Sequence, residues 1–187
     1  SEDRNFAYVP AENTWQRDPH AAYLHYTSNE TIGGLQFPFI PTAQDNVPLV
    51  CDMSSDFLSR EIDVSRFGLI YAGAQKNIGP SGLTVLIIRE DLLGKARADL
   101  PTMLNYQVHA DADSMYNTPA TYPIYIAGLV FKWLKKQGGI KAMQARNEEK
   151  ADVLYQVIDS SNGFYHCHID KEFRSRMNVV FRLKDDA

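Results

Sequence analysis

Two residues of this sequence have the side-chain chemistry and the position expected of a catalytic site. Lys76 lies in a glycine-rich loop, Y-A-G-A-Q-K-N-I-G-P-S-G, that separates two short apolar segments, residues 67–72 and 83–88. Asp52 directly follows a third apolar segment, residues 47–51. A lysine amine can bond covalently to a carbonyl carbon, and a carboxylate can stabilise a cationic ring nitrogen. The pair is therefore a candidate for a site that binds a ring with a cationic nitrogen beside a reactive lysine.

Each of these residues also has a simpler structural explanation. Most lysines at a strand-to-loop junction are solvated, and an aspartate just past a strand commonly forms a turn or caps a helix. A buried strand that ends in aspartate is costly, because a desolvated carboxylate must be paired. Both explanations of Asp52 stay open on these residues alone, so further motifs are needed to choose between them.

The elements that position these residues are predicted to be strands of an α/β protein. Three short segments are apolar and rich in β-branched and aromatic residues: 21–27, 47–51 and 67–72. They end near Thr31, Asp52 and Ala72, and parallel strands place their carboxyl ends at one edge of a sheet, where ligands bind. The turn at residues 79–82 reverses the chain, so residues 83–88 are expected to run antiparallel.

The rest of the chain is predicted to be mostly helical, with two more strands near its end. Asn117, Thr118 and Pro119 are expected to open a helix, with Thr118 as the N-cap and Pro119 at the first helical position. The following apolar residues recur at helical spacing and predict a buried stripe of Ile126, Leu129, Val130, Trp133 and Leu134. We expect this helix to run from Pro119 through residues 124–136, which carry the stripe, and a second helix over residues 140–159. Strands are expected over 164–169 and 177–183, and irregular structure over 101–113.

The composition argues against several classes of function. With 187 residues, of which 44% are hydrophobic, the chain can form one large core or one domain plus part of another. The net charge of −4 does not favour a nucleic-acid partner. The sequence contains no apolar run of the ~18 residues that a membrane span requires. The loops G-x-G-x-x-G and G-x-x-x-x-G-K-[ST], which would indicate a nucleotide-binding α/β domain, do not occur.

Neither a disulfide framework nor a metal site is expected. Two cysteines, Cys51 and Cys167, do not make a disulfide framework, and Cys51 fits a buried apolar position in a reducing compartment, so we expect a cytoplasmic protein. Two groups of residues alternate along the chain without the further ligands that a metal would need: His109, Asp111 and Asp113, and His166 and His168.

A set of ordered motifs gives a more specific indication. The motifs are H-Y-T-S-N-E-T-I-G-G (25–34), V-C-D-M-S-S (50–55), L-S-R-E-I-D-V-S-R-F-G (58–68), G-A-Q-K-N-I-G-P-S-G (73–82), M-Y-N-T-P (115–119) and F-K-W-L-K-K-Q-G-G (131–139). Together they resemble the bacterial type of phosphoserine aminotransferase, a class-V aminotransferase among the fold-type I enzymes that use pyridoxal phosphate. The resemblance extends over essentially the whole chain.

The resemblance implies a fold and a domain division. Residues 1–136 would be the C-terminal half of the large, mostly parallel-sheet domain that binds pyridoxal phosphate, and residues 137–187 the start of a smaller α+β domain. By the same resemblance, about half of the enzyme is missing. The missing upstream part would hold a phosphate-binding loop and an aromatic residue that stacks on the pyridine ring. The missing downstream part would hold the arginine that binds the substrate carboxylate.

The resemblance also implies the cofactor and the residues around it. Lys76 would be the catalytic lysine that bonds to pyridoxal phosphate, and Asp52 would pair with the pyridine nitrogen. Thr31 would lie at the phenolic oxygen of the ring, and Gln75 at the phosphate. Asn117 and Thr118 would reach the cofactor phosphate of the neighbouring subunit in a homodimer.

The reaction implied is reversible transfer of an amino group, in which 3-phosphohydroxypyruvate and glutamate give phosphoserine and 2-oxoglutarate in serine biosynthesis. A phosphorylated hydroxythreonine of pyridoxine biosynthesis is a possible additional substrate. The alternative is an inactive proteolytic or truncated fragment that serves only as a structural part of the dimer.

Overall fold

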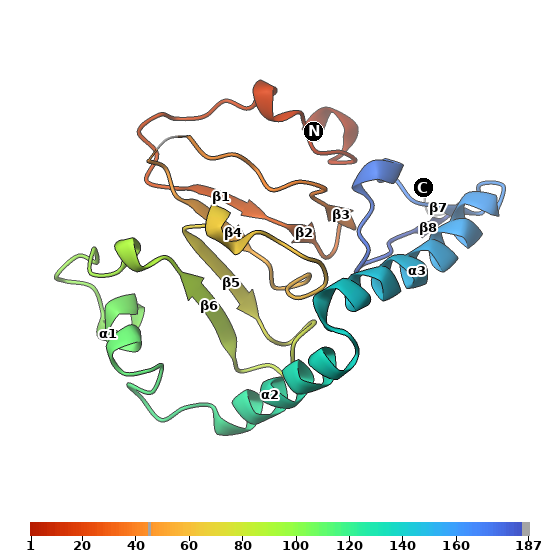
Figure 1. Ribbon diagram of the computed structural model, residues 1–187. Coiled ribbons are helices and arrows are strands. Elements are labelled where there is room, and N and C mark those ends of the chain that lie inside the picture. The colour runs from red at the N-terminus through yellow and green to blue at the C-terminus, as the bar shows by residue number, and fades with distance from the viewer. Residues whose placement is uncertain (45, 185–187) are drawn as a thin grey trace.

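The computed structural model describes residues 1–44 and 46–184 (Figure 1). The strands are β1 (Leu24–Thr27), β2 (Asn29–Glu30), β3 (Leu35–Gln36), β4 (Leu49–Asp52), β5 (Leu69–Gly73), β6 (Thr84–Ile88), β7 (Tyr165–His166) and β8 (Arg182–Leu183). The helices are α1 (Tyr106–Asp111), α2 (Thr121–Lys136) and α3 (Gly139–Ser160). Single 3-10 turns are η1 (Glu2–Arg4), η2 (Glu12–Thr14), η3 (Val64–Arg66), η4 (Glu90–Leu92), η5 (Thr102–Leu104) and η6 (Lys171–Phe173).

The central sheet has the strand order β1-β4-β5-β6. Strands β1, β4 and β5 are parallel, and β6 pairs antiparallel with β5, which confirms the predicted reversal of the chain at residues 79–82. The register places Asp52 between Thr27 and Tyr71. The predicted strands therefore do end at a common edge of the sheet.

The two faces of this sheet differ in character. One face forms a hydrophobic core around Tyr26, Leu49, Cys51 and Ile70, which packs against Phe57 of the loop after β4. Burial raises the pKa of the Cys51 thiol to about 12, so this cysteine is a neutral apolar residue, as predicted. Because side chains alternate along a strand, the next residues in sequence, including Asp52 and Tyr71, lie on the other face.

A second hydrophobic cluster lies along α3, which extends away from the sheet in Figure 1. Ala151, Tyr155 and Ile158 of the helix pack there with Cys167 and Ile169. Val9 and Leu35, far away in sequence, belong to the same cluster.

The start of α2 differs from the prediction. The helix begins at Thr121, with Ala120 rather than Thr118 at the N-cap position. Pro123 explains the difference, because a helix that began at Pro119 would need the missing N–H of Pro123 to bond the Pro119 carbonyl. The backbone N–H of Thr121 donates to that carbonyl instead, at 2.8 Å. At its observed position Pro123 lies in the first turn, where no such bond is required.

Three other predictions, on the length of two kinds of element and on the burial of α2, were only partly right. Residues 101–113 are not wholly irregular, because α1 forms there with Asn105 capping it by accepting from the Gln107 N–H. The strands predicted over 164–169 and 177–183 are reduced to β7 and β8, which pair with each other. The predicted stripe on α2 is only partly buried: Leu134 is buried, whereas Leu129 and Trp133 are exposed.

No helix within residues 1–44 and 46–184 combines the length and the apolar character needed to span a membrane. In the same part of the chain, no three His, Cys, Asp or Glu side chains are grouped as a metal site would require.

A buried carboxylate anchors the loop after β4 to the loops around it. Asp56 is only 4% exposed and accepts hydrogen bonds from the Ser28 hydroxyl and from the Gln36 amide at 3.1 Å. Arg60 lies 3.5 Å away. Burial is the main cause of the raised pKa of Asp56, because removal from water disfavours the charged form.

This shift predicts how Asp56→Asn changes stability with pH. The folded state holds the Asp56 proton more tightly than the unfolded state, so the contribution of this group is favourable at low pH. It is lost as the pH rises from about 4, the unfolded pKa, through the folded pKa. The asparagine cannot titrate, and its amide can donate to the Ser28 oxygen while that hydroxyl donates to the Asp52 carbonyl. We expect the variant to gain in unfolding free energy, relative to wild type, as the pH rises.

Urea unfolding at a series of pH values measures this difference. Asp63→Asn is the matched control, because hydrogen bonds from Ser65 lower the pKa of Asp63 and the sign is therefore opposite. A difference between Asp56→Asn and wild type that does not change with pH would show that Asp56 has no raised pKa in the folded protein.

Candidate active site

At the carboxyl edge of the parallel strands, two of the predicted site residues, Lys76 and Thr31, are in contact. The Lys76 amine donates a hydrogen bond of 2.5 Å to the Thr31 hydroxyl. Thr31 follows β1 and β2, whereas Lys76 follows β5, so the contact joins segments that are remote in sequence. Lys76 is exposed and Thr31 is half-buried. The amine is therefore held at the edge while remaining accessible to a ligand.

The loop that carries Lys76 is fixed on three sides. Its chain turns tightly, with the Ala74 carbonyl accepting from the Gly79 N–H at 2.9 Å. The Asn77 amide donates to the Phe57 carbonyl at 2.7 Å, which connects the loop to the one after β4. A side chain at Gly79 would place its Cβ 3.4 Å from Cβ of Ala127, a buried residue of α2. These contacts set the position of the lysine before any ligand binds.

Asp52 is the last residue of β4, and its side chain forms the turn contact expected of an aspartate with a structural role. Its carboxylate accepts from the Ser54 N–H at 2.8 Å, and the Ser54 hydroxyl accepts from the Gly73 N–H at 3.0 Å. These bonds join the end of β4 to the end of β5 and orient the carboxylate. Asp52 remains half-buried, so its contact within the turn does not remove it from the edge.

Tyr71, which the sequence did not indicate, is paired with Asp52 in the sheet and contacts His25. Burial and the neighbouring Asp52 carboxylate both raise the pKa of Tyr71, so the phenol keeps its proton. The Tyr71 hydroxyl lies 3.0 Å from Nε2 of His25, and the two rings are stacked with centroids 6.0 Å apart. The parallel register is the one signal that could have found Tyr71, because it pairs Tyr71 with Asp52.

The other three predicted residues are not joined to this group. Gln75 is exposed beside Lys76, and its side chain folds back, so that a Cβ added at Gly73 would lie 2.6 Å from Oε1 of Gln75. Asn117 and Thr118 are exposed in the segment before α2. Within the described residues, the only side-chain hydrogen bond of this pair runs from the Asn117 amide to the Thr118 carbonyl, at 3.4 Å.

The group at the edge fits pyridoxal phosphate by its chemistry. An amine can bond to the aldehyde carbon, a carboxylate can face the pyridine nitrogen, and a hydroxyl can donate to the phenolic oxygen. Lys76, Asp52 and Thr31 supply one of each: Asp52 ends β4, Lys76 follows β5, and Thr31 follows the short strand β2 that comes after β1.

Comparison with known proteins gives a consistent result. The model of the class-V aminotransferase family matches residues 2–187. The phosphoserine aminotransferase of Chromobacterium violaceum is 82% identical over 187 residues, which are 100% of this chain and 52% of that protein. That of Laribacter hongkongensis is 66% identical over 186 residues, 100% of this chain and 51% of that protein. The chain thus spans about half the length of the curated relatives it matches.

Solved structures agree with the sequence relatives. The phosphoserine aminotransferase from Bacillus circulans subsp. alkalophilus superposes with a TM-score of 0.95 at 49% identity, over 98% of this chain and 50% of that one. A phosphoserine aminotransferase from Trichomonas vaginalis, solved with pyridoxal phosphate bound, gives a TM-score of 0.90 at 43% identity, over 97% of this chain and 50% of that one. The mixed α/β fold with its mainly parallel sheet is therefore the fold-type I architecture that the motifs implied. This chain belongs to the class-V aminotransferase family.

Proposed function

We propose that this chain is part of a phosphoserine aminotransferase that uses pyridoxal phosphate. The enzyme would transfer an amino group from glutamate to 3-phosphohydroxypyruvate and give phosphoserine and 2-oxoglutarate. The observation that carries the proposal is the Lys76–Thr31 contact at the carboxyl edge of the sheet. Its support is a sequence 82% identical, over the whole chain, to a protein of that name.

Each residue at the edge has a separate role in this proposal. Bound pyridoxal phosphate supplies an aldehyde that can exchange amino groups and a ring that can take up electrons. Lys76 would be the residue that holds the cofactor at its aldehyde carbon, and its amine would carry a proton to and from the substrate carbon. Asp52 keeps a proton on the pyridine nitrogen, since a carboxylate favours the cationic form. Thr31 orients the phenolic oxygen, and Gln75 reaches the phosphate.

We also propose the domain division at residues 136 and 137. The two hydrophobic clusters support it, because one packs on the sheet and the other lies along α3, with Phe37 packed against both. The boundary is not a complete separation of the two parts in space. Val9 and Leu35 lie before residue 137 in sequence but pack in the cluster along α3.

Asn117 and Thr118 are proposed to act in a homodimer, at the cofactor phosphate of the neighbouring subunit. Both side chains are exposed, which leaves them available to a second subunit. Large apolar side chains around them are exposed as well and would be covered in such an interface: Met115, Tyr116, Tyr122, Ile124 and Tyr125.

The activity is tested in a protein of the relatives' full length that contains this sequence. With pyridoxal phosphate, glutamate and 3-phosphohydroxypyruvate, we expect phosphoserine to form. Lys76→Ala should lower the rate by at least about a thousandfold, because both the covalent bond and the proton carrier are lost. Borohydride reduction followed by peptide mapping should place the cofactor on Lys76 in the unsubstituted protein.

The 187-residue chain alone serves as a second sample. We expect it to form no phosphoserine, because it spans about half the length of the relatives it matches. A cofactor label on another lysine, with Lys76 unmodified, would contradict the assignment. If the full-length protein binds pyridoxal phosphate but transfers no amino group to this substrate, the family assignment stands and the proposed substrate is wrong.

A mixed dimer tests the role of Asn117 and Thr118. One full-length subunit carries Lys76→Ala, and the other carries Asn117→Ala with Thr118→Ala. If the pair acts across the interface, one site of the mixed dimer has both defects and the other is intact. The purified mixed dimer, isolated by two different tags, should then show about half the wild-type rate.

The two parent homodimers are the controls, and both should be nearly inactive. If Asn117 and Thr118 served their own subunit, neither site of the mixed dimer would be intact. Activity no higher than that of the parent dimers would therefore show that the pair does not act in trans.

A further inference from the structure

Four polar residues from three segments of the chain are joined by hydrogen bonds to one another. We call them the Asn29 cluster: Asn29, Ser55, Ser175 and Asn178. Asn29 is 1% exposed and Ser175 is fully buried. Polar groups this deeply buried are costly unless they are hydrogen-bonded, so the contacts within the cluster are informative.

Hydrogen bonds within the Asn29 cluster pair the buried side-chain donors and acceptors of Asn29. The Asn29 amide donates to the Ser55 hydroxyl at 2.8 Å and to the Asn178 side-chain oxygen at 2.7 Å. Its own side-chain oxygen accepts from the Ser175 hydroxyl. The Ser55 hydroxyl donates to the Asn29 carbonyl at 2.8 Å. Both hydrogens and the oxygen of the Asn29 amide are therefore used, which fixes its orientation.

The chain positions of these residues connect the cluster to the candidate active site. Asn29 lies two residues before Thr31, and Ser55 lies three residues after Asp52. Ser175 and Asn178 lie far along the chain, beyond α3 and η6. The cluster thus joins the loop of Thr31 to the loop of Asp52, and both to residues 175–178.

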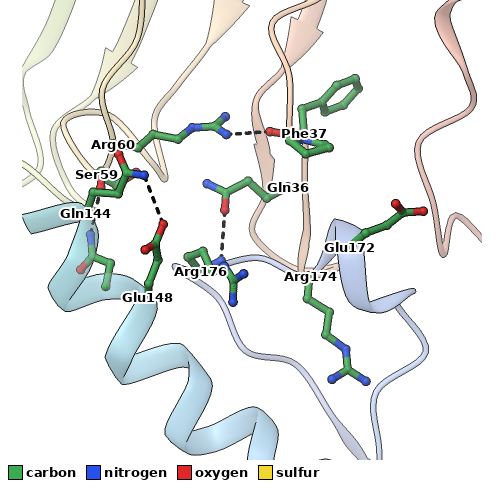
Figure 2. Close-up of a pocket in the computed structure, with 11 residues that line it drawn as sticks. Gln36, Phe37, Ser59, Arg60, Gln144, Glu148, Glu172, Arg174 and Arg176 are labelled. Carbon is green, nitrogen blue, oxygen red and sulfur yellow. Dashed lines mark hydrogen bonds between the residues drawn. The ribbon is translucent and has the colours of Figure 1, made fainter. Parts of the chain in front are cut away.

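The segment that holds Ser175 is fixed from both sides. The Tyr155 hydroxyl of α3 donates to the Ser175 carbonyl, and the Ser175 N–H donates to the Gly34 carbonyl, each at 2.8 Å. Next to it, the Arg176 N–H donates to the Gln36 side chain at 3.1 Å, as Figure 2 shows beside the cavity that α3 lines. Movement of α3 relative to the sheet would therefore be transmitted to Ser175.

We propose that Asn29, Ser175 and Asn178 are positioning residues of the cofactor site, through which the segment after α3 holds the loops of Thr31 and Asp52 in place. The inference rests on the proposed function, because it assumes that these two residues bind pyridoxal phosphate. Within the described residues, none of the three has a side-chain hydrogen bond to Thr31, Asp52 or Lys76. They act by limiting displacement of the binding groups, and a shift of about 1 Å in such a group is enough to weaken a site severely.

The test uses the full-length protein and measures the dissociation constant of pyridoxal phosphate by equilibrium dialysis of the apoprotein. Ser175→Ala removes the hydroxyl that donates to Asn29 and leaves a buried acceptor unpaired. We expect the dissociation constant to rise about tenfold or more. Asn178→Ala removes the acceptor of the Asn29 amide, and Asn178 is less buried than Ser175. If Ser175→Ala does not fold, the same measurement is made on Asn178→Ala.

Asn147→Ala is the matched control. Asn147 of α3 is also buried, and its amide donates to the Ser59 carbonyl at 3.3 Å, seven residues after Asp52 in the loop that follows β4. Within the described residues, no side-chain hydrogen bond joins Asn147 to Thr31 or to the Asn29 cluster. We expect this variant to lose stability to urea, as Ser175→Ala does, while its dissociation constant stays within about twofold of wild type. The comparison separates a general loss of stability from a loss of positioning.

Pyridoxal phosphate binding by the unsubstituted protein and by the variants distinguishes a wrong inference from a wrong proposed function. If the unsubstituted protein binds no pyridoxal phosphate, the proposed function fails and the inference with it. If the unsubstituted protein binds the cofactor and the folded Ser175 or Asn178 variant binds it equally well, the inference alone is overturned. An equal rise in Asn147→Ala also overturns it, because the effect would then be one of stability.

Discussion

The parallel register of β1, β4 and β5 is the constraint on which the candidate active site depends. It sets Asp52 beside Tyr71 and brings the segments after the three strands to one edge of the sheet. A shift of one residue in β4 would turn Asp52 into the hydrophobic face and Cys51 out of it, because side chains alternate along a strand. The burial of Cys51 therefore determines where the carboxylate points.

Packing beyond the sheet converts this shared edge into a site of defined geometry. The lysine loop is fixed by Asn77 and by the close approach of α2 at Gly79. The loop after β4 is fixed by the buried carboxylate of Asp56 and by the Asn29 cluster. Loops are usually the mobile part of an α/β protein, so a site built from them needs such anchors. Here the anchors come from both the hydrophobic core and buried polar groups.

Local sequence patterns were sufficient for the elements whose signal is local. The apolar segments before Asp52 and around the Lys76 loop predicted β4, β5 and β6, with the reversal between the last two. The start of α2 was missed because two prolines, at 119 and 123, offer competing starts and only the second is compatible with the backbone bonds. The long strands expected near residues 164–183 did not form, since apolar residues there pack in the cluster along α3 instead of extending β7 and β8. The hydrogen bond between Ser175 and Asn29 joins residues 146 positions apart, and no local pattern records it.

The central claim is that Asp52 holds a proton on the pyridine nitrogen of a cofactor bonded to Lys76. Nitrogen-15 NMR of the full-length protein loaded with ring-labelled pyridoxal phosphate measures that proton directly. We predict a protonated pyridine nitrogen in the unsubstituted protein and a largely unprotonated one in Asp52→Asn, whose neutral amide no longer stabilises the cation. A nitrogen that is equally protonated in both proteins would contradict the claim and leave Asp52 with its turn contact to Ser54 alone.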